Sequence, residues 1–118
     1  MPDAYITLTQ RMLSKSEINA NKTVQQFILE DFGMDYTDKF FENRNKLRVT
    51  GEYIDGEEVN VHFFRRSGRG DKMISIQKLG QYADAGNEIR LSSDAESLHD
   101  ATRIYINVYT SGAEADAA

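Results

Sequence analysis

Two short polar segments hold the side chains best suited to recognising another molecule. Residues 64–72 read Phe-Arg-Arg-Ser-Gly-Arg-Gly-Asp-Lys, and residues 14–22 read Ser-Lys-Ser-Glu-Ile-Asn-Ala-Asn-Lys. Arginine and lysine can neutralise phosphates or donate hydrogen bonds to guanine, and hydroxyl, amide and carboxylate groups can contact base edges. Both segments therefore indicate a nucleic-acid surface, with a solvated basic turn and an ordinary polar connector as the alternatives.

The charge of the chain is distributed unevenly. Its formal net charge is −5, yet residues 62–78 carry five cations and one acid, a net +4. Residues 10–22 carry three cations and one acid, a net +2, whereas residues 80–118 carry seven acids and two arginines, a net −5. Local potential steers a polyanion more than total charge does. The distribution thus permits nucleic-acid binding by an acidic protein.

Catalytic chemistry has less support in the sequence. Metal-dependent nucleases need converging carboxylates, but Asp71 is not followed by the acidic-x-Lys unit that such enzymes use. Glu57 and Glu58 would point to opposite faces of a strand. His62 and His99 are far apart in the sequence, without ligand-like neighbours. We therefore expect no catalytic residue, no metal and no cofactor, and a standalone nuclease is only the third hypothesis.

The composition is that of one globular domain. The chain has 118 residues, of which 40% are hydrophobic and 28% are charged, and it has no cysteine. We expect one domain over residues 1–110 and a disordered, acidic tail over residues 111–118. No apolar run is long enough to span a membrane, and no signal peptide is visible. These features, with the lack of cysteine, predict a cytoplasmic protein without a membrane partner.

The elements around the two polar segments are expected to be mostly strands. Alternating apolar and polar residues predict strands over 5–9, 46–66 (as a hairpin), 72–79, 87–91 and 103–109. Capping-box patterns at 14–17 and 93–96 allow short helices, and another short helix is expected over 36–42. The phenylalanines assigned to the core are Phe27, Phe32, Phe40, Phe41 and Phe63.

Two local patterns can be read further. The spacing of Val24, Phe27 and Ile28 slightly favours a helix over residues 23–30, although a short apolar run also fits a strand. In the hairpin, a three-residue loop ending at Gly56 places the apolar side chains on one face. The pairs predicted by that loop are Leu47 with Phe63, Val49 with Val61, and Gly51 with Val59.

Three motifs in their order along the chain resemble a known family. They are Leu-Ser-Lys-Ser-Glu at 13–17, the aromatic strand, basic turn and returning strand at 61–74, and Ala-Gly-Asn-Glu-Ile-Arg-Leu at 85–91. This order is similar to that of the B3-like DNA-binding pseudobarrel. The family includes plant B3 transcription-factor domains and the N-terminal effector domain of EcoRII-type restriction endonucleases. The resemblance covers residues 8–109.

The resemblance implies a mainly β (α+β) fold, an open pseudobarrel of about seven mostly antiparallel strands with one or two short helices. It also implies that residues 23–30 form a strand, against the local periodicity. Two arms would clamp the major groove of double-stranded DNA. The matching positions are Ser14, Lys15, Ser16, Glu17, Asn19, Asn21 and Lys22 in the first arm, and Arg65, Arg66, Arg69, Asp71 and Lys72 in the second.

The family also suggests a partner and a role. Cations facing guanine and carboxylates facing cytosine N4 suit a short site that contains G·C pairs. In restriction endonucleases of this type the domain is not catalytic and controls a separate nuclease domain, which in this case would lie in the same full-length protein. The hypothesis from another class is a protein-binding module, an inhibitor or interaction domain that uses the acidic surface.

Overall fold

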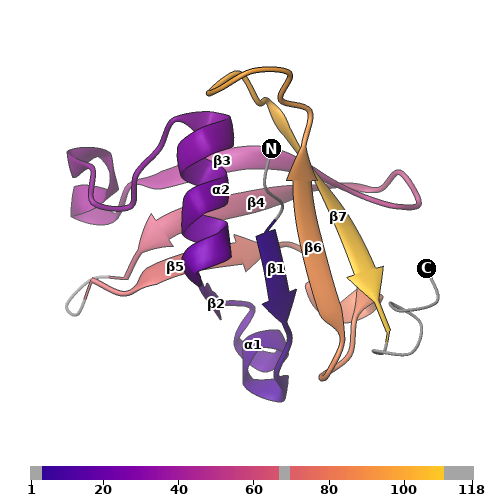
Figure 1. The fold of residues 1–118 in the computed structure, drawn as a ribbon. Coiled ribbons are helices and arrows are strands. Elements are labelled where there is room, and N and C mark those ends of the chain that lie inside the picture. The colour runs from indigo at the N-terminus through magenta and orange to yellow at the C-terminus, as the bar shows by residue number, and fades with distance from the viewer. Residues whose placement is uncertain (1–3, 67–69, 111–118) are drawn as a thin grey trace.

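The computed structural model describes residues 4–66 and 70–110 (Figure 1). In these ranges the strands are β1 (Ala4–Thr7), β2 (Ile18–Asn19), β3 (Lys46–Tyr53), β4 (Glu58–Arg65), β5 (Lys72–Ile76), β6 (Glu88–Ser93) and β7 (Arg103–Tyr109). The helices are α1 (Gln10–Lys15), α2 (Lys22–Phe32), the 3₁₀ helix η1 (Lys39–Arg44) and α3 (Leu79–Tyr82). The predicted tail, residues 111–118, and Arg69 lie outside the described residues.

All the described strands belong to one curled sheet that forms a half-barrel. Their order is β1-β6-β7-β3-β4-β5-β2. Strands β3 and β7 are parallel, and the other neighbours among the described strands are antiparallel. This confirms the predicted mainly β, open pseudobarrel, although the structure has three short α-helices where one or two were expected.

The β3–β4 hairpin has the predicted register. Its pairs include Leu47 with Phe63, Val49 with Val61, and Gly51 with Val59. Gly56 closes the loop with a φ of 89°, a left-handed conformation that glycine adopts without strain. Gly51 has a different reason to be glycine, because a Cβ there would lie 2.7 Å from Cγ2 of Val61.

Residues 23–30 form part of helix α2, so the strand implied by the family resemblance is wrong and the local periodicity was right. The positions at helical spacing are buried, namely Val24, Phe27 and Ile28. The side chain of Asn21 caps the helix by accepting a hydrogen bond from the Val24 amide at 3.0 Å. Gly33 ends it with a φ of 71°. Figure 1 shows α2 lying across one face of the sheet.

Neither capping-box pattern starts a helix. Helix α1 begins earlier, because the Thr9 side chain accepts a hydrogen bond from the Met12 amide, and Ser14 falls in its last turn. Ser93 ends β6, and the following residues form an irregular loop. In that loop Asp94 accepts hydrogen bonds from the backbone amides of Thr102 and Arg103 instead of starting a helix. A carboxylate at this position therefore ties the ends of a loop together.

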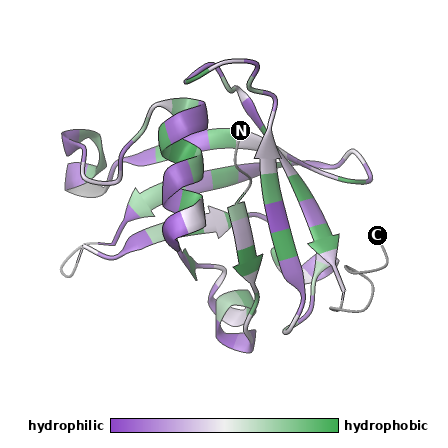
Figure 2. Ribbon diagram, in the orientation of Figure 1, coloured by the Kyte–Doolittle hydropathy of each residue, from purple (hydrophilic) through white to green (hydrophobic). Residues whose placement is uncertain are grey.

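The core fills the space between the sheet and α2. It includes the aromatic residues Phe27, Phe41, Phe63 and Tyr53, each at most 2% exposed. Phe40 was assigned to the core but is 42% exposed. Along β6 apolar and polar residues alternate, as the colouring of Figure 2 shows, because one face of the strand is buried and the other is not. In the part of the chain that is described, no helix combines the length and the hydropathy needed to cross a membrane.

Candidate nucleic-acid interface

The two polar segments lie side by side. We call residues 9–20, which contain α1 and β2, the first arm, and residues 65–66 and 70–73, at the β4–β5 turn, the second arm. Strand β2 pairs with β5, and the Ala20 amide donates to the Lys72 carbonyl at 2.9 Å. The ladder between β2 and β5 therefore joins the arms directly.

A groove of about 640 Å³ lies between the arms. We call it the inter-arm groove. Its lining residues are Thr9, Arg11, Met12, Lys15, Glu17, Asn19, Ala20, Gln25, Arg66, Gly70, Asp71, Lys72 and Met73. Four of these are cations and two are acids, so the described lining has a formal net charge of +2 in a chain whose net charge is −5. The groove is thus a local positive region on an acidic protein.

An ion pair bridges the two arms. Nη2 of Arg66 donates to Oε2 of Glu17 at 3.0 Å. The two side chains are 42% and 36% exposed, respectively, so water reaches both. Accessible pairs of this kind contribute only about 0–1 kcal/mol to stability. The contact therefore orients two charged side chains of the groove lining without fixing them firmly.

Helix α2 supplies a third element of the site. Nζ of Lys72 donates to Oε1 of Gln25 at 3.3 Å, and Nε2 of Gln25 donates to the Ala20 carbonyl at 2.8 Å. Gln25 thereby holds the Lys72 ammonium group against the backbone of the first arm. A free lysine side chain has many conformations and loses entropy when a ligand fixes it. The contact with Gln25 already restricts Lys72, so less entropy is lost on binding.

Asn21, predicted to contact DNA, connects helix α2 to the edge strand β1. Besides capping α2, its Nδ2 donates to the Tyr5 carbonyl at 2.8 Å. The Tyr5 amide donates to Oγ1 of Thr23 at 3.0 Å. These contacts satisfy backbone groups on the outer edge of β1, where the sheet has no further strand.

The other predicted residues divide into two groups. Lys15, Glu17, Asn19, Arg66, Asp71 and Lys72 line the inter-arm groove. Outside its lining, Ser14 donates to the Arg11 carbonyl, Ser16 follows α1 in a left-handed conformation, and Lys22 lines a smaller hollow of about 280 Å³. Arg65 reaches toward η1, where its Nη2 lies 3.4 Å from the Asp38 carbonyl.

Sequence reasoning did not select Thr9, Arg11, Met12 or Gln25, which also line the groove. Arg11 belongs to the segment with a net charge of +2, and that excess was a usable signal. Thr9 was missed because the start of α1 depends on its cap. Gln25 could be found only after α2 was known to be a helix that packs beside the second arm.

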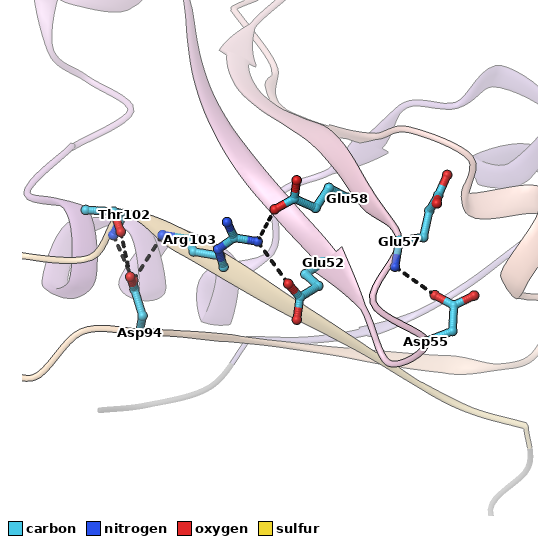
Figure 3. Close-up of polar contacts among 7 residues, drawn as sticks. All are labelled: Glu52, Asp55, Glu57, Glu58, Asp94, Thr102 and Arg103. Carbon is cyan, nitrogen blue, oxygen red and sulfur yellow. Dashed lines mark hydrogen bonds and ion pairs between the residues drawn. The ribbon is translucent and has the colours of Figure 1, made fainter.

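The opposite end of β4 carries acidic residues with assigned partners. Arg103 Nη1 lies 2.9 Å from Glu52 Oε1 and 2.6 Å from Glu58 Oε2 (Figure 3). Glu57 forms an ion pair with Lys78. Asp55 accepts hydrogen bonds from the Glu57 amide and the Tyr82 hydroxyl, and these hold the pKa of its carboxyl below the usual value, the Glu57 amide having the larger effect. Among the described residues, no group of three or more acidic or histidine side chains is placed to hold a metal ion.

Comparisons with known proteins do not assign this arrangement to a family. No model of a known protein family matches the chain, and no curated protein matches it either. The relation to the B3-like pseudobarrel accordingly remains a prediction from the sequence.

Proposed function

We propose that the chain binds double-stranded DNA at a specific sequence, with its two arms in the major groove. The observation that carries this proposal is the inter-arm groove, where two cation-bearing segments about 50 residues apart in the sequence meet. Its four cations against two acids give the positive region that a polyanion requires. The remaining acidic surface would disfavour docking in other orientations.

The shapes of the arms suit a duplex. The major groove admits an α-helix or a two-stranded β-ribbon. The first arm contains the short helix α1, and the second is the end of the β4–β5 ribbon. Single-stranded binding relies on exposed aromatic platforms between basic residues, whereas the lining of the inter-arm groove contains no aromatic side chain among its described residues.

The chemistry of the lining suits sequence reading. Arg66 can donate two hydrogen bonds to guanine, Glu17 can accept one from cytosine N4, and Asn19 can pair with adenine. We therefore propose a short recognition site that contains G·C pairs.

The proposal includes a role that follows from the family resemblance. In that role the chain is a non-catalytic, cytoplasmic effector or target-recognition domain, coupled to a nuclease domain in the same full-length protein. It is consistent with a site built for binding rather than for cleavage. Among the described residues, two acids line the groove, Glu17 on the first arm and Asp71 on the second. Glu17 is engaged by Arg66. Such a pair lacks the set of converging carboxylates that phosphodiester cleavage by metal ions requires.

Selection of duplexes from a random pool at fixed salt tests the proposal. We expect one sequence family to be enriched, and its affinity to fall with salt by about 0.9 log units per log unit of salt for each phosphate neutralised. An unenriched pool, or binding that does not depend on salt, would contradict the proposal and favour the protein-binding hypothesis. Cleavage of the selected duplex in magnesium by this chain alone would contradict the non-catalytic role.

A further inference from the structure

Glu17 lies at the point where the two arms meet. Oε2 of Glu17 accepts a hydrogen bond from Nη2 of Arg66 at 3.0 Å, although the two residues are 49 positions apart in the sequence. A carboxylate at this position is unexpected in a groove proposed to bind a polyanion. It removes one of the four cations from immediate use and adds a negative charge that would face phosphates.

The backbone beneath the two side chains is fixed on both arms. The Arg66 amide donates to the Asp71 carbonyl at 2.8 Å, and the Gly70 amide donates to the Arg66 carbonyl at 3.0 Å. Ile18, which follows Glu17, pairs with Ile74 in the ladder between β2 and β5. The meeting of Glu17 and Arg66 is thus imposed by the fold. Their side chains remain exposed enough for a ligand to separate them.

We infer, on the basis of the proposed DNA binding, that Glu17 is an internal competitor for Arg66 that weakens binding to DNA lacking the recognised sequence. On a non-cognate duplex Arg66 meets phosphates, or an A·T pair whose two acceptors are separated by the adenine amino group, and Glu17 faces the negative charge of the phosphates. A G·C pair offers guanine O6 and N7 to Arg66 and the cytosine N4 amino group to Glu17 on the same major-groove edge. Such a pair replaces the contacts of both side chains more fully than an A·T pair does, because guanine offers Arg66 two adjacent acceptors and adenine offers it one.

Substitution of Glu17 separates this role from a general charge effect. The dissociation constants of wild type and Glu17→Gln are measured at one salt concentration, on the selected duplex and on a random duplex. We expect the variant to bind random DNA roughly three- to tenfold more tightly, because the competing carboxylate is gone. Its preference for the selected duplex should fall by about tenfold or more, because cytosine N4 loses a charged acceptor.

Glu57→Gln is the matched control. It removes the same charge from another exposed ion pair, with Lys78, at the far end of β4. We expect it to change both dissociation constants by similar, small factors and to leave the preference unchanged. In an Arg66→Gln background, Glu17→Gln should tighten binding to random DNA by a smaller factor, because it then removes only the repulsion between the carboxylate and the phosphates and no guanidinium is left to compete for. Thermal unfolding of each variant verifies that the fold is intact.

The outcomes distinguish the two levels of the proposal. If wild type shows salt-dependent, sequence-selective binding and Glu17→Gln behaves like Glu57→Gln, internal competition is excluded while the DNA-binding function stands. Equal tightening by Glu17→Gln with and without Arg66 also excludes it. Wild type that binds no duplex overturns both.

Discussion

The two ends of strand β4 use similar residue types in different ways. At the β3–β4 end, Arg103 is held between the carboxylates of Glu52 and Glu58, and Lys78 pairs with Glu57. At the β4–β5 end, four cations share the inter-arm groove with two acids. Among the described residues there, Arg11 and Lys15 form no ion pair. Each cation named at the first end is paired with a carboxylate and helps to hold a loop in place. The second end instead keeps an excess of cations that a ligand can use.

Removing two cations from each end is the strongest test of this contrast. Arg66→Ala combined with Lys72→Ala should weaken binding to the selected duplex by about 2 kcal/mol or more, since a bidentate base contact alone contributes on the order of 1–3 kcal/mol. The salt slope should fall by about 0.9 for each contact that was made to a phosphate. Fluorescence anisotropy at several salt concentrations measures both quantities.

The matched pair at the other end is Arg103→Ala combined with Lys78→Ala. It removes the same charge, but it leaves Glu52, Glu57 and Glu58 without these partners. We expect lower stability and nearly unchanged affinity for DNA at temperatures where the variant is folded. Equal losses of affinity in the two double variants would show that only total charge matters, and would remove the distinction between the ends.

Gly51→Ala tests whether β3 and β4 keep the two ends in register. The added methyl group would lie 2.7 Å from Val61 Cγ2 and 3.1 Å from Ile106 Cδ1, so these side chains or their strands must shift. We expect a loss of about 1–3 kcal/mol in the free energy of unfolding, measured in denaturant. Gly80→Ala is the control, since its Cβ meets nothing within 4 Å and its place in α3 favours alanine. Similar unfolding curves for both variants would contradict the tight packing at Gly51.

Gln25→Ala probes how one groove cation is oriented. Without Gln25, the Lys72 ammonium group loses its acceptor and part of its fixed direction. We expect a loss of about 1 kcal/mol in binding to the selected duplex, the usual contribution of a single hydrogen bond. Gln26→Ala, one position along α2 and bonded to Glu30, should have no effect. Tighter binding by Gln25→Ala would instead mean that Gln25 competes with DNA for Lys72.

The smallest expected effect concerns His62, which lies along β4 between the two ends. Burial, and then the nearby charges of Lys46 and Arg48, lower the pKa of His62 from its ordinary value of 6.5. The unfolded chain therefore takes up a proton more readily than the folded one as the pH falls below about 6.5, and stability decreases. His62→Gln should show a smaller fall in Tm between pH 8 and pH 5 than wild type. Parallel pH profiles would mean that neither burial nor the nearby cations lower the pKa of His62 in the folded chain.

The sequence predicted those parts of the fold that depend on local patterns. Alternation over residues 46–66 and the glycine at position 56 defined the hairpin and its register, because a shift by one residue would have exposed its apolar face. The spacing of Val24, Phe27 and Ile28 identified α2. The family resemblance misassigned that segment, since motif order carries no information on which element follows the first arm. Here the first arm is followed by α2, which begins at Lys22.

The candidate site was predicted in outline but not in detail. Charge excess identified both segments, and the structure brings them together in one groove. The sequence could not show that Asn21 caps a helix and closes the edge of β1, because the same amide suits a cap or a base contact. Nor could it show Gln25 beside Lys72, a contact that depends on tertiary packing across 47 positions. Local chemistry thus indicates where a surface lies, whereas folding decides which side chains remain available to it.

The hydrogen bonds between β2 and β5 have one more consequence. Because the two arms are hydrogen-bonded to each other, the inter-arm groove has a preset width. The groove cannot widen for a broad ligand or narrow around a thin one unless these backbone hydrogen bonds break. Any molecule taken between the arms must therefore already have a matching width, so that shape is screened before chemical detail is compared.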